Sequence, residues 1–149
     1  MFTIDASVLV AANTPDEVAH ASARAFLQRA LASGAAVHQP TLAVVEVTAG
    51  IARRTGDPAH ARAVGVQSLG LPGLVLHDLD GDAALVAAGL ASDLGLRAAE
   101  AVYAATALVH GTVLVTLDVE LATRASTVIE AHTPAGWLEL QGERRTNDD

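Results

Sequence analysis

The stretch Thr112-Val113-Leu114-Val115-Thr116-Leu117-Asp118 decides the fold. It is a short, continuous apolar run rich in β-branched residues, which is typical of a strand buried on both faces of a parallel sheet. The run ends in a carboxylate, Asp118, and a helical pattern follows at residues 119–126. A buried strand that ends in an acid and leads into a helix indicates an α/β fold with a polar site at one sheet edge.

Strand and helix signals alternate along the rest of the chain. This alternation predicts a single α/β domain with a central parallel sheet of about five short strands and helices on both faces. Pro15 is expected in the first turn of its helix and Thr41 at a helix N-cap. We expect the domain at residues 1–140, with Trp137 packed onto it, and a polar, disordered tail at residues 141–149. The other strands are expected at residues 2–4, 36–39, 74–77 and 127–132, and the other helices at residues 6–12, 15–33, 41–54, 58–68, 82–94 and 97–110.

Composition and charge limit the function. The 149 residues include no cysteine, carry a formal net charge of −8 and use arginine as their only strongly basic residue. Such an acidic protein does not bind nucleic acid through bulk electrostatics, so an RNA substrate would need a few placed arginines and a screening metal. No apolar run reaches the roughly 18 residues of a membrane span, and the first residues lack the basic start of a signal peptide. We therefore expect a cytoplasmic protein.

Four carboxylates stand alone in apolar or small-residue runs: Asp5, Glu46, Glu100 and Asp118. A buried unpaired carboxylate is costly, and acids of this kind are seldom buried without a partner. Asp5 and Asp118 each follow a predicted strand, and the two glutamates lie near the start of helices. Because ligands of a parallel sheet bind at the carboxyl ends of its strands, we expect all four acids at one rim.

A divalent cation is the most economical shared partner for these acids. Oxygen ligands without cysteine or histidine favour Mg²⁺ or Mn²⁺, and such an ion supports phosphodiester hydrolysis. Each acid also has a simpler explanation: Asp5 and Asp118 would cap the following helices, and Glu46 and Glu100 would interact with helix dipoles. The matching positions of all four favour the shared site.

Taken together, four segments resemble the PIN-domain ribonucleases, in particular the VapC-like toxins of bacterial toxin–antitoxin pairs. Phe2-Thr3-Ile4-Asp5-Ala6-Ser7 is similar to their opening Asp-x-Ser/Thr motif, and Glu46 within residues 40–46 to their second acid. Glu100 within residues 96–107 is similar to their third acid, and Asp118 within residues 113–118 to their fourth. The similarity runs from Phe2 to about Leu138, and its specificity lies in the order and spacing of all four segments.

The resemblance implies a Mg²⁺- or Mn²⁺-dependent endoribonuclease that forms homodimers and is inhibited by an antitoxin. In this family the antitoxin fits a basic residue into the acidic pocket. Asp5, Glu100 and Asp118 would hold the metal, and Glu46 would be a further ligand or a water-positioning base. Ser7 and Thr116 would support the acids with their hydroxyls. The third acid is usually aspartate in this family, so Glu100 is a departure that puts the geometry of the metal site in question.

Three alternatives stay open. The chain is a toxin, a PIN-like protein-binding module that has lost catalysis, or a PIN nuclease of RNA processing or DNA repair without an antitoxin. Arg53, Arg54 and Arg97 are candidate RNA contacts, although arginines at helix ends also interact with the helix dipole. Glu120 is a candidate outer ligand.

Other signals are set aside. The six histidines show no metal-ligand spacing, and His38, His77 and His110 are interpreted as residues at the ends of elements. Residues 78–82 lack the later glycine and glutamate of a calcium loop. The chain has no glycine-rich phosphate loop, and Asp5-Ala6-Ser7 lacks the second aspartate of haloacid-dehalogenase-like phosphatases.

Overall fold

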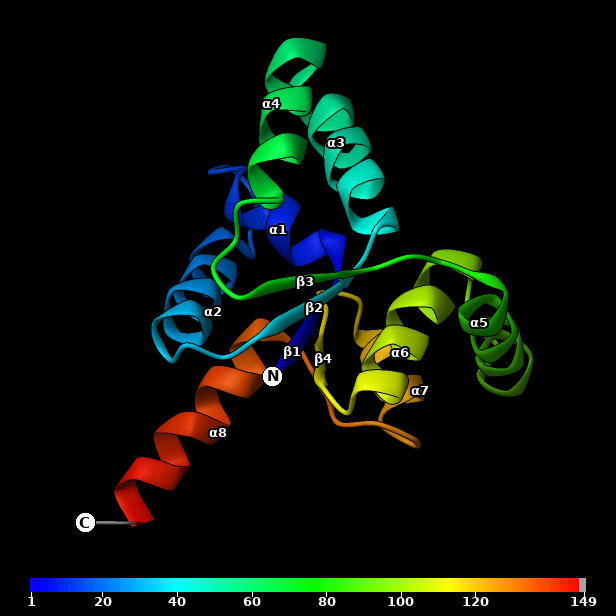
Figure 1. Cartoon of the computed structure of the whole chain (residues 1–149). Helices are drawn as coiled ribbons and strands as arrows, with labels where there is room; N and C mark the ends of the chain where they lie inside the picture. The colour runs from blue at the N-terminus through cyan, green and yellow to red at the C-terminus, as the bar shows by residue number, and fades with distance from the viewer. Residues whose placement is uncertain (148–149) are drawn as a thin grey trace.

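Within residues 1–147, which the computed structural model describes, five short strands form one sheet (Figure 1). The strand order is β3-β2-β1-β4-β5, and every neighbouring pair is parallel. The predicted α/β fold with a parallel sheet of five strands is therefore confirmed. The strands are β1 (Phe2–Ile4), β2 (Val37–Pro40), β3 (Leu74–His77), β4 (Val113–Val115) and β5 (Ala131–His132).

Helices cover both faces of this sheet, as predicted (Figure 1). α6 packs against β1, β2 and β4, and α5 packs on the outside of α6. α1, α2 and α8 lie on the other side, whereas α3 and α4 form a hairpin that projects beyond the sheet. The helices are α1 (Ala6–Ala12), α2 (His20–Ala32), α3 (Leu42–Thr55), α4 (Pro58–Ser68), α5 (Gly81–Leu94), α6 (Ala98–His110), α7 (Val119–Ala125) and α8 (Pro134–Asn147).

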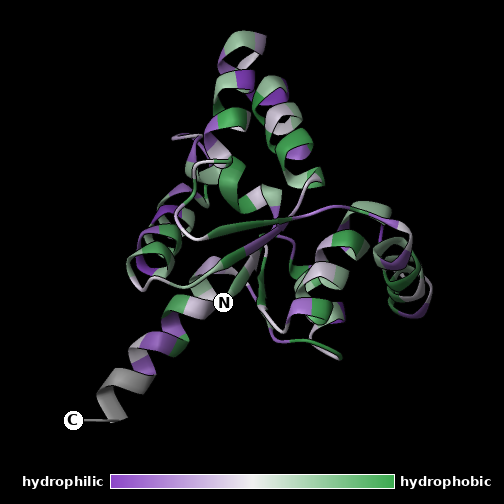
Figure 2. Cartoon of the chain, viewed as in Figure 1, coloured by the Kyte–Doolittle hydropathy of each residue, from purple (hydrophilic) through white to green (hydrophobic). Residues whose placement is uncertain are grey.

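The core consists mainly of Ala, Val and Leu side chains from the strands and the inner helix faces. Hydrophobic residues make up most of α5, whereas hydrophilic residues interrupt α8 (Figure 2). Three aromatic rings, those of Phe2, Phe26 and Trp137, pack edge to face with centroids 5.3 to 5.4 Å apart. This geometry is favourable for aromatic pairs, and it attaches α8 to β1 and α2 through Trp137. No helix in the described part of the chain is long and apolar enough to cross a membrane.

The helix expected from residue 15 begins only at His20, so Pro15 is not in its first turn. Residues 14–19 form turns instead, and Val18 is fully exposed. A helical turn without a buried face gains little from packing and does not offset the cost of ordering it. Thr41 occupies the N-cap position of α3, as predicted, but within the described residues its side chain forms no capping hydrogen bond.

The strand expected at residues 127–132 contains only Ala131 and His132. The preceding amide groups bond back to the end of α7: Val128 and Ile129 both donate to the carbonyl of Ala125. These donors are therefore not available to the sheet. α8 continues to Asn147, through most of the segment for which a disordered tail is expected. Residues 148 and 149 lie outside the described residues, and the domain boundary at residue 140 stays a prediction.

A glycine at the contact between α3 and α4 tests how closely these helices pack. This glycine is Gly65 in α4, and Gly89 in α5 serves as the control. A Cβ atom on Gly65 would lie 2.0 Å from Thr48 Oγ1, whereas a Cβ atom on Gly89 would meet nothing within 4 Å. Alanine stabilises a helix interior by roughly 1 kcal/mol relative to glycine. Gly89→Ala should raise the free energy of unfolding by about this amount, and Gly65→Ala should lower it by about 1 kcal/mol or more through overpacking. Urea unfolding measures both, and equal stabilisation would contradict the close α3–α4 contact.

Candidate functional site

Asp5 lies directly after β1, at the centre of the sheet's carboxyl edge. Its Oδ2 atom accepts hydrogen bonds from the Ser7 hydroxyl at 2.6 Å and from the Thr116 hydroxyl at 2.7 Å. Within the described residues its side chain does not cap α1, so the simple helix-cap explanation does not apply to Asp5. Its carboxylate is held instead by two hydroxyls, one from α1 and one from the segment after β4.

The two hydroxyls are themselves held in place by the backbone after β4. Ser7 Oγ accepts from the Leu117 amide at 3.2 Å, and Thr116 Oγ1 accepts from the Asp118 amide at 3.0 Å. Each hydroxyl therefore receives one hydrogen bond and donates another to Asp5. A network in which every member is satisfied fixes the orientation of its side chains, so Asp5 is a rigidly placed carboxylate.

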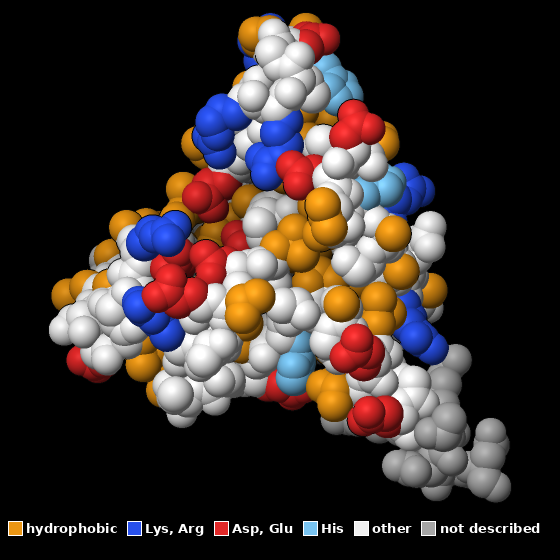
Figure 3. All heavy atoms as spheres, turned by 180° about the vertical axis from the view of Figure 1, so that it is seen from behind, with side chains coloured by type: hydrophobic (Ala, Val, Ile, Leu, Met, Phe, Trp, Pro, Cys, Tyr) orange, Lys and Arg blue, Asp and Glu red, His pale blue; other side chains and the backbone are white. Residues whose placement is uncertain are grey.

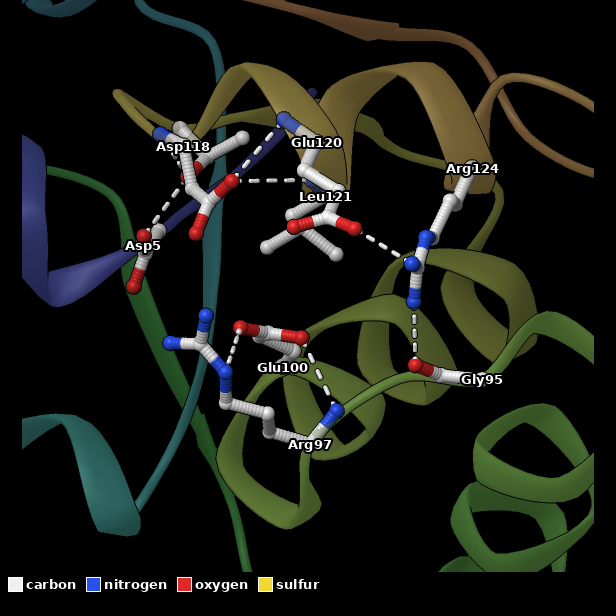
Figure 4. Close-up of polar contacts among 9 residues, drawn as sticks. Asp5, Gly95, Arg97, Glu100, Asp118, Glu120, Leu121 and Arg124 are labelled. Carbon is white, nitrogen blue, oxygen red and sulfur yellow. Dashed lines mark hydrogen bonds and ion pairs between the residues drawn. The ribbon is translucent and has the colours of Figure 1, made fainter.

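Asp118 lies after β4 and begins α7. Its Oδ1 atom accepts from the amides of Glu120 at 2.9 Å and Leu121 at 3.0 Å. The helix-cap explanation therefore describes one oxygen of Asp118. Its other oxygen turns toward Glu100 (Figure 4), where it could bind a ligand.

Glu100 lies in the first turn of α6, where its Oε2 atom accepts from the Arg97 amide at 2.9 Å. Its Oε1 atom forms an ion pair with the Arg97 side chain, with 3.4 Å between Oε1 and Nε. The Glu100 side chain is only 17% exposed, whereas that of Arg97 is 77% exposed. Arg97, a candidate RNA contact, thus lies beside an acid of the site, on the side that faces Asp5 (Figure 4).

Glu46 lies in the second turn of α3 and is half-buried. Burial raises the pKa of its carboxyl group above the ordinary value. The nearby hydroxyl of Tyr103 opposes this rise, and the charge of Asp5 adds to it. Tyr103 is 1% exposed, and its hydroxyl has no full hydrogen bond within the described residues. Burial, followed by the charges of Glu46 and Asp5, raises the pKa of the Tyr103 hydroxyl.

Together these residues form the acidic recess, which we define as Asp5, Glu46, Glu100, Asp118 and Tyr103. Asp5, Glu100 and Asp118 face a common space (Figure 4), and acidic side chains lie beside a hollow in the surface with arginines around it (Figure 3). Within the described residues, no three carboxylates bring their oxygens to within 4.8 Å of one another. Mg²⁺ binds directly through one or two carboxylates and keeps several waters, so these acids fit such an ion if part of the set binds it through its waters.

The remaining candidate residues lie around or outside the acidic recess. The positive charge of Arg53 lowers the pKa of Glu46 and therefore lies near it. Arg54 pairs with Glu17 at the surface. Glu120 pairs with Arg124, which also donates to the carbonyl of Gly95 (Figure 4). The carboxylate of Glu120 thus has another partner, which disfavours its role as an outer ligand.

Two features of the structure were missed from the sequence. The first is the position of the Tyr103 hydroxyl beside Glu46. Glu100 and Tyr103 are three residues apart and share one face of their helix, which could have indicated from the sequence that Tyr103 belongs to the site. The structure also brings His38, His77 and His110 together, with one ring nitrogen of each within 4.8 Å of the others. His77 and His110 are the last residues of β3 and α6, as interpreted from the sequence, whereas His38 lies inside β2. The sequence did not show that the three rings meet. Their spacing in the sequence is irregular because three separate elements supply them.

Removal of the Arg97 side chain tests whether it competes with a cation. Arg97→Ala frees the Glu100 carboxylate from its ion pair and removes a positive charge beside Asp5. We expect Mn²⁺ to bind this variant about 3- to 10-fold more tightly, measured by calorimetry at low ionic strength. Arg62→Ala, which removes an exposed arginine from α4, is the matched control. Equal affinities of both variants would contradict the competition.

The raised pKa of Glu46 predicts a pH-dependent stability difference. Ionisation of Glu46 costs more in the folded than in the unfolded protein, so its contribution to stability is lost as the pH rises through the folded-state pKa. Glu46→Gln removes this loss. In metal-free buffer we expect a higher urea midpoint for the variant at about pH 7.5 and the same midpoint as wild type at about pH 4. Glu139→Gln, at an exposed position of α8, should show no such difference; a pH-independent effect of Glu46→Gln would contradict the assignment.

The family model described as "PIN domain" matches residues 2–126. No curated protein matches the chain in sequence.

Several solved structures share the fold. FitAcB from Neisseria gonorrhoeae has a TM-score of 0.66 and 22% identity, over 90% of this chain and 98% of that chain. VapC20 from Mycobacterium tuberculosis, described as a Sarcin-Ricin loop cleaving toxin, has a TM-score of 0.68 and 16% identity, over 83% of this chain and 94% of that chain. VapBC2 from Rickettsia felis, bound to a promoter DNA fragment, has a TM-score of 0.65 and 12% identity, over 89% of this chain and 97% of that chain. With the family model covering most of its length, the chain belongs to the PIN domain family.

Proposed function

We propose that the protein is a Mg²⁺- or Mn²⁺-dependent endoribonuclease that acts in the cytoplasm as the toxin of a toxin–antitoxin pair. The observation that carries the proposal is the fixed carboxylate of Asp5, held by Ser7 and Thr116 beside Asp118 and Glu100. Membership of the PIN domain family supports a nuclease. The structures similar in fold support a toxin, since they include a toxin described as cleaving the Sarcin-Ricin loop.

Asp5, Asp118 and Glu100 would hold the metal ion in this proposal. The ion would lower the pKa of a bound water and stabilise the charge that develops on the phosphodiester. Asp5 keeps its orientation because two hydroxyls donate to one of its oxygens. Glu100 would exchange its ion pair with Arg97 for the metal.

Glu46 is the proposed general base. Its half-buried carboxyl group has a raised pKa, and a base whose pKa lies closer to the working pH transfers protons more effectively. The buried Tyr103 hydroxyl, which has no hydrogen-bond partner within the described residues, would donate to the attacking water or to a phosphate oxygen. Because the formal net charge is −8, RNA would be held locally, by Arg53 near Glu46 and by Arg97 once it leaves Glu100.

The proposed partners are an antitoxin and a second copy of the chain. Three of the structures similar in fold are described as complexes bound to DNA, namely VapBC2, FitAB and a VapBC from Salmonella typhimurium. An antitoxin of this chain would insert a basic side chain into the acidic recess, where Arg97 now pairs with Glu100. A cationic side chain there is favoured because Arg97 and Arg53 compensate the negative charge of the four carboxylates only in part.

Two observations favour a second candidate, a protein-binding module without catalysis. Glu100 stands at the position where aspartate is usual in the family, and it is paired with Arg97. In addition, no three carboxylates of the described chain converge within 4.8 Å. This candidate predicts no RNA cleavage with either metal, and a gain of cleavage in Glu100→Asp.

RNA cleavage with Mg²⁺ or Mn²⁺ tests the proposal directly. Asp5→Asn and Asp118→Asn should each reduce cleavage at least about 100-fold and should abolish growth arrest on expression, because each loses a metal ligand. Asp93→Asn, which changes an exposed acid on α5, is the matched control and should keep full activity. Circular dichroism verifies that all variants are folded. Folded Asp5→Asn and Asp118→Asn proteins that cleave as fast as wild type would overturn the assigned site.

A further inference from the structure

Three histidine rings form a cluster at a distance from the acidic recess. His38 comes from β2, His77 is the last residue of β3, and His110 is the last residue of α6. His38 Nδ1 and His77 Nε2 lie 2.9 Å apart and share a hydrogen bond. The rings of His77 and His110 stack with centroids 3.7 Å apart, and those of His38 and His110 lie 5.0 Å apart.

The surroundings of this histidine cluster favour the neutral form of His38 and His77. All three residues are half-buried. Burial lowers the pKa of both His38 and His77, and the charge of the neighbouring His110 lowers them further. Within the described residues, no carboxylate forms an ion pair with any of the three, whereas His132 pairs with Glu130. Neutral imidazole with a free lone pair is the form that ligates metals.

A cavity of about 570 Å³ adjoins the cluster. His77 and His110 line it together with apolar residues of α5 and α6 and three acids from the segment that begins α5. These acids are Asp78, Asp80 and Asp82. Water in this cavity could therefore reach a metal ion bound by the histidines.

We propose that His38, His77 and His110 form a second metal site, specific for a borderline transition ion such as Zn²⁺ and with its fourth position open to the cavity. Three histidines plus a water are an established ligand set for Zn²⁺. Two nitrogens of a tetrahedral site, each about 2.0–2.1 Å from the metal, lie about 3.3 Å apart. The cluster already holds one nitrogen of each ring within 4.8 Å of the others.

Metal binding at the histidine cluster requires side-chain rotation. The lone pair of an imidazole nitrogen lies in the plane of its ring. The stacked rings must therefore rotate away from one another until one nitrogen lone pair of each ring points at the ion. The hydrogen bond between His38 and His77 would then be replaced by two coordinate bonds. The ion would connect β2, the edge strand β3 and the end of α6, which are joined in the described structure by packing and by the β2–β3 hydrogen bonds.

The two sites should select different ions. Imidazole ligands suit Zn²⁺, Co²⁺ and Ni²⁺, whereas carboxylates suit Mg²⁺ and Mn²⁺. Glu100 and His110 lie near opposite ends of α6, about 15 Å apart along the helix axis. Binding at the histidine cluster is therefore independent of the nuclease proposed above and can be tested without RNA.

Cobalt absorption tests the proposal on the full chain after chelator treatment. We expect one equivalent of Co²⁺ to give the visible bands of a tetrahedral site, and Zn²⁺ to displace it. His38→Gln, His77→Gln and His110→Gln should each weaken binding at least tenfold. His60→Gln, at an exposed position of α4, and Asp5→Asn, in the acidic recess, should leave it unchanged. Unchanged binding in all three cluster variants, or loss of binding in Asp5→Asn, would overturn the proposal.

Thermal unfolding of the wild-type protein gives a second test that needs no variant to fold. Zn²⁺ at about 100 times its dissociation constant should raise the Tm by at least about 5 °C. Mg²⁺ at the same concentration should not produce this rise. Absence of a Zn²⁺-dependent shift, together with absence of tetrahedral cobalt bands, would show that the cluster is only a packed stack of imidazole rings.

Discussion

The hydrogen bonds that Ser7 and Thr116 donate to the Asp5 carboxylate are the constraint on which the rest of the site depends. They join α1 to the segment after β4, and the Asp5 amide adds a third connection by donating to the carbonyl of Val115. The register of β1 against β4, in which Ile4 faces Val115, brings these groups together. Because the same segment continues into Asp118 and α7, the position of one acid determines the position of the next.

Negative charge dominates this edge of the sheet, and the protein compensates it incompletely. Asp5 and Asp118 receive hydrogen bonds from hydroxyls and amides, and Glu100 receives the charge of Arg97. The Tyr103 hydroxyl and the charge of Arg53 act on Glu46, but burial outweighs them and raises its pKa. The Tyr103 hydroxyl beside it is left without a partner in the described chain. Incomplete compensation of buried polar groups is expected at functional sites. A cation in the acidic recess would supply the missing positive charge.

Features that follow from a local pattern or from a general rule of parallel sheets could be predicted from the sequence. Features that depend on contacts between distant segments could not. Asp5 and Asp118 could be placed because a parallel sheet brings the carboxyl ends of its strands to one edge. The late start of α2 depends on whether residues 14–19 find a surface to bury, which no local pattern shows. The histidine cluster depends on the pairing of β2 with β3, in which Pro40 lies opposite His77, and on where α6 ends. Register and helix docking are properties of the whole fold, so irregular spacing in the sequence concealed the cluster.

The central position of β1 has a consequence for synthesis. Asp5 and Thr116 are separated by 111 residues, and β1 pairs with β4 as well as with β2. At about 5 to 20 residues per second, the ribosome needs several seconds after Asp5 to add the strand and hydroxyl that complete its surroundings. A nascent chain with a finished β2 and α3 therefore still lacks the fixed carboxylate. Parallel topology thus delays assembly of the acidic recess until most of the chain has been made.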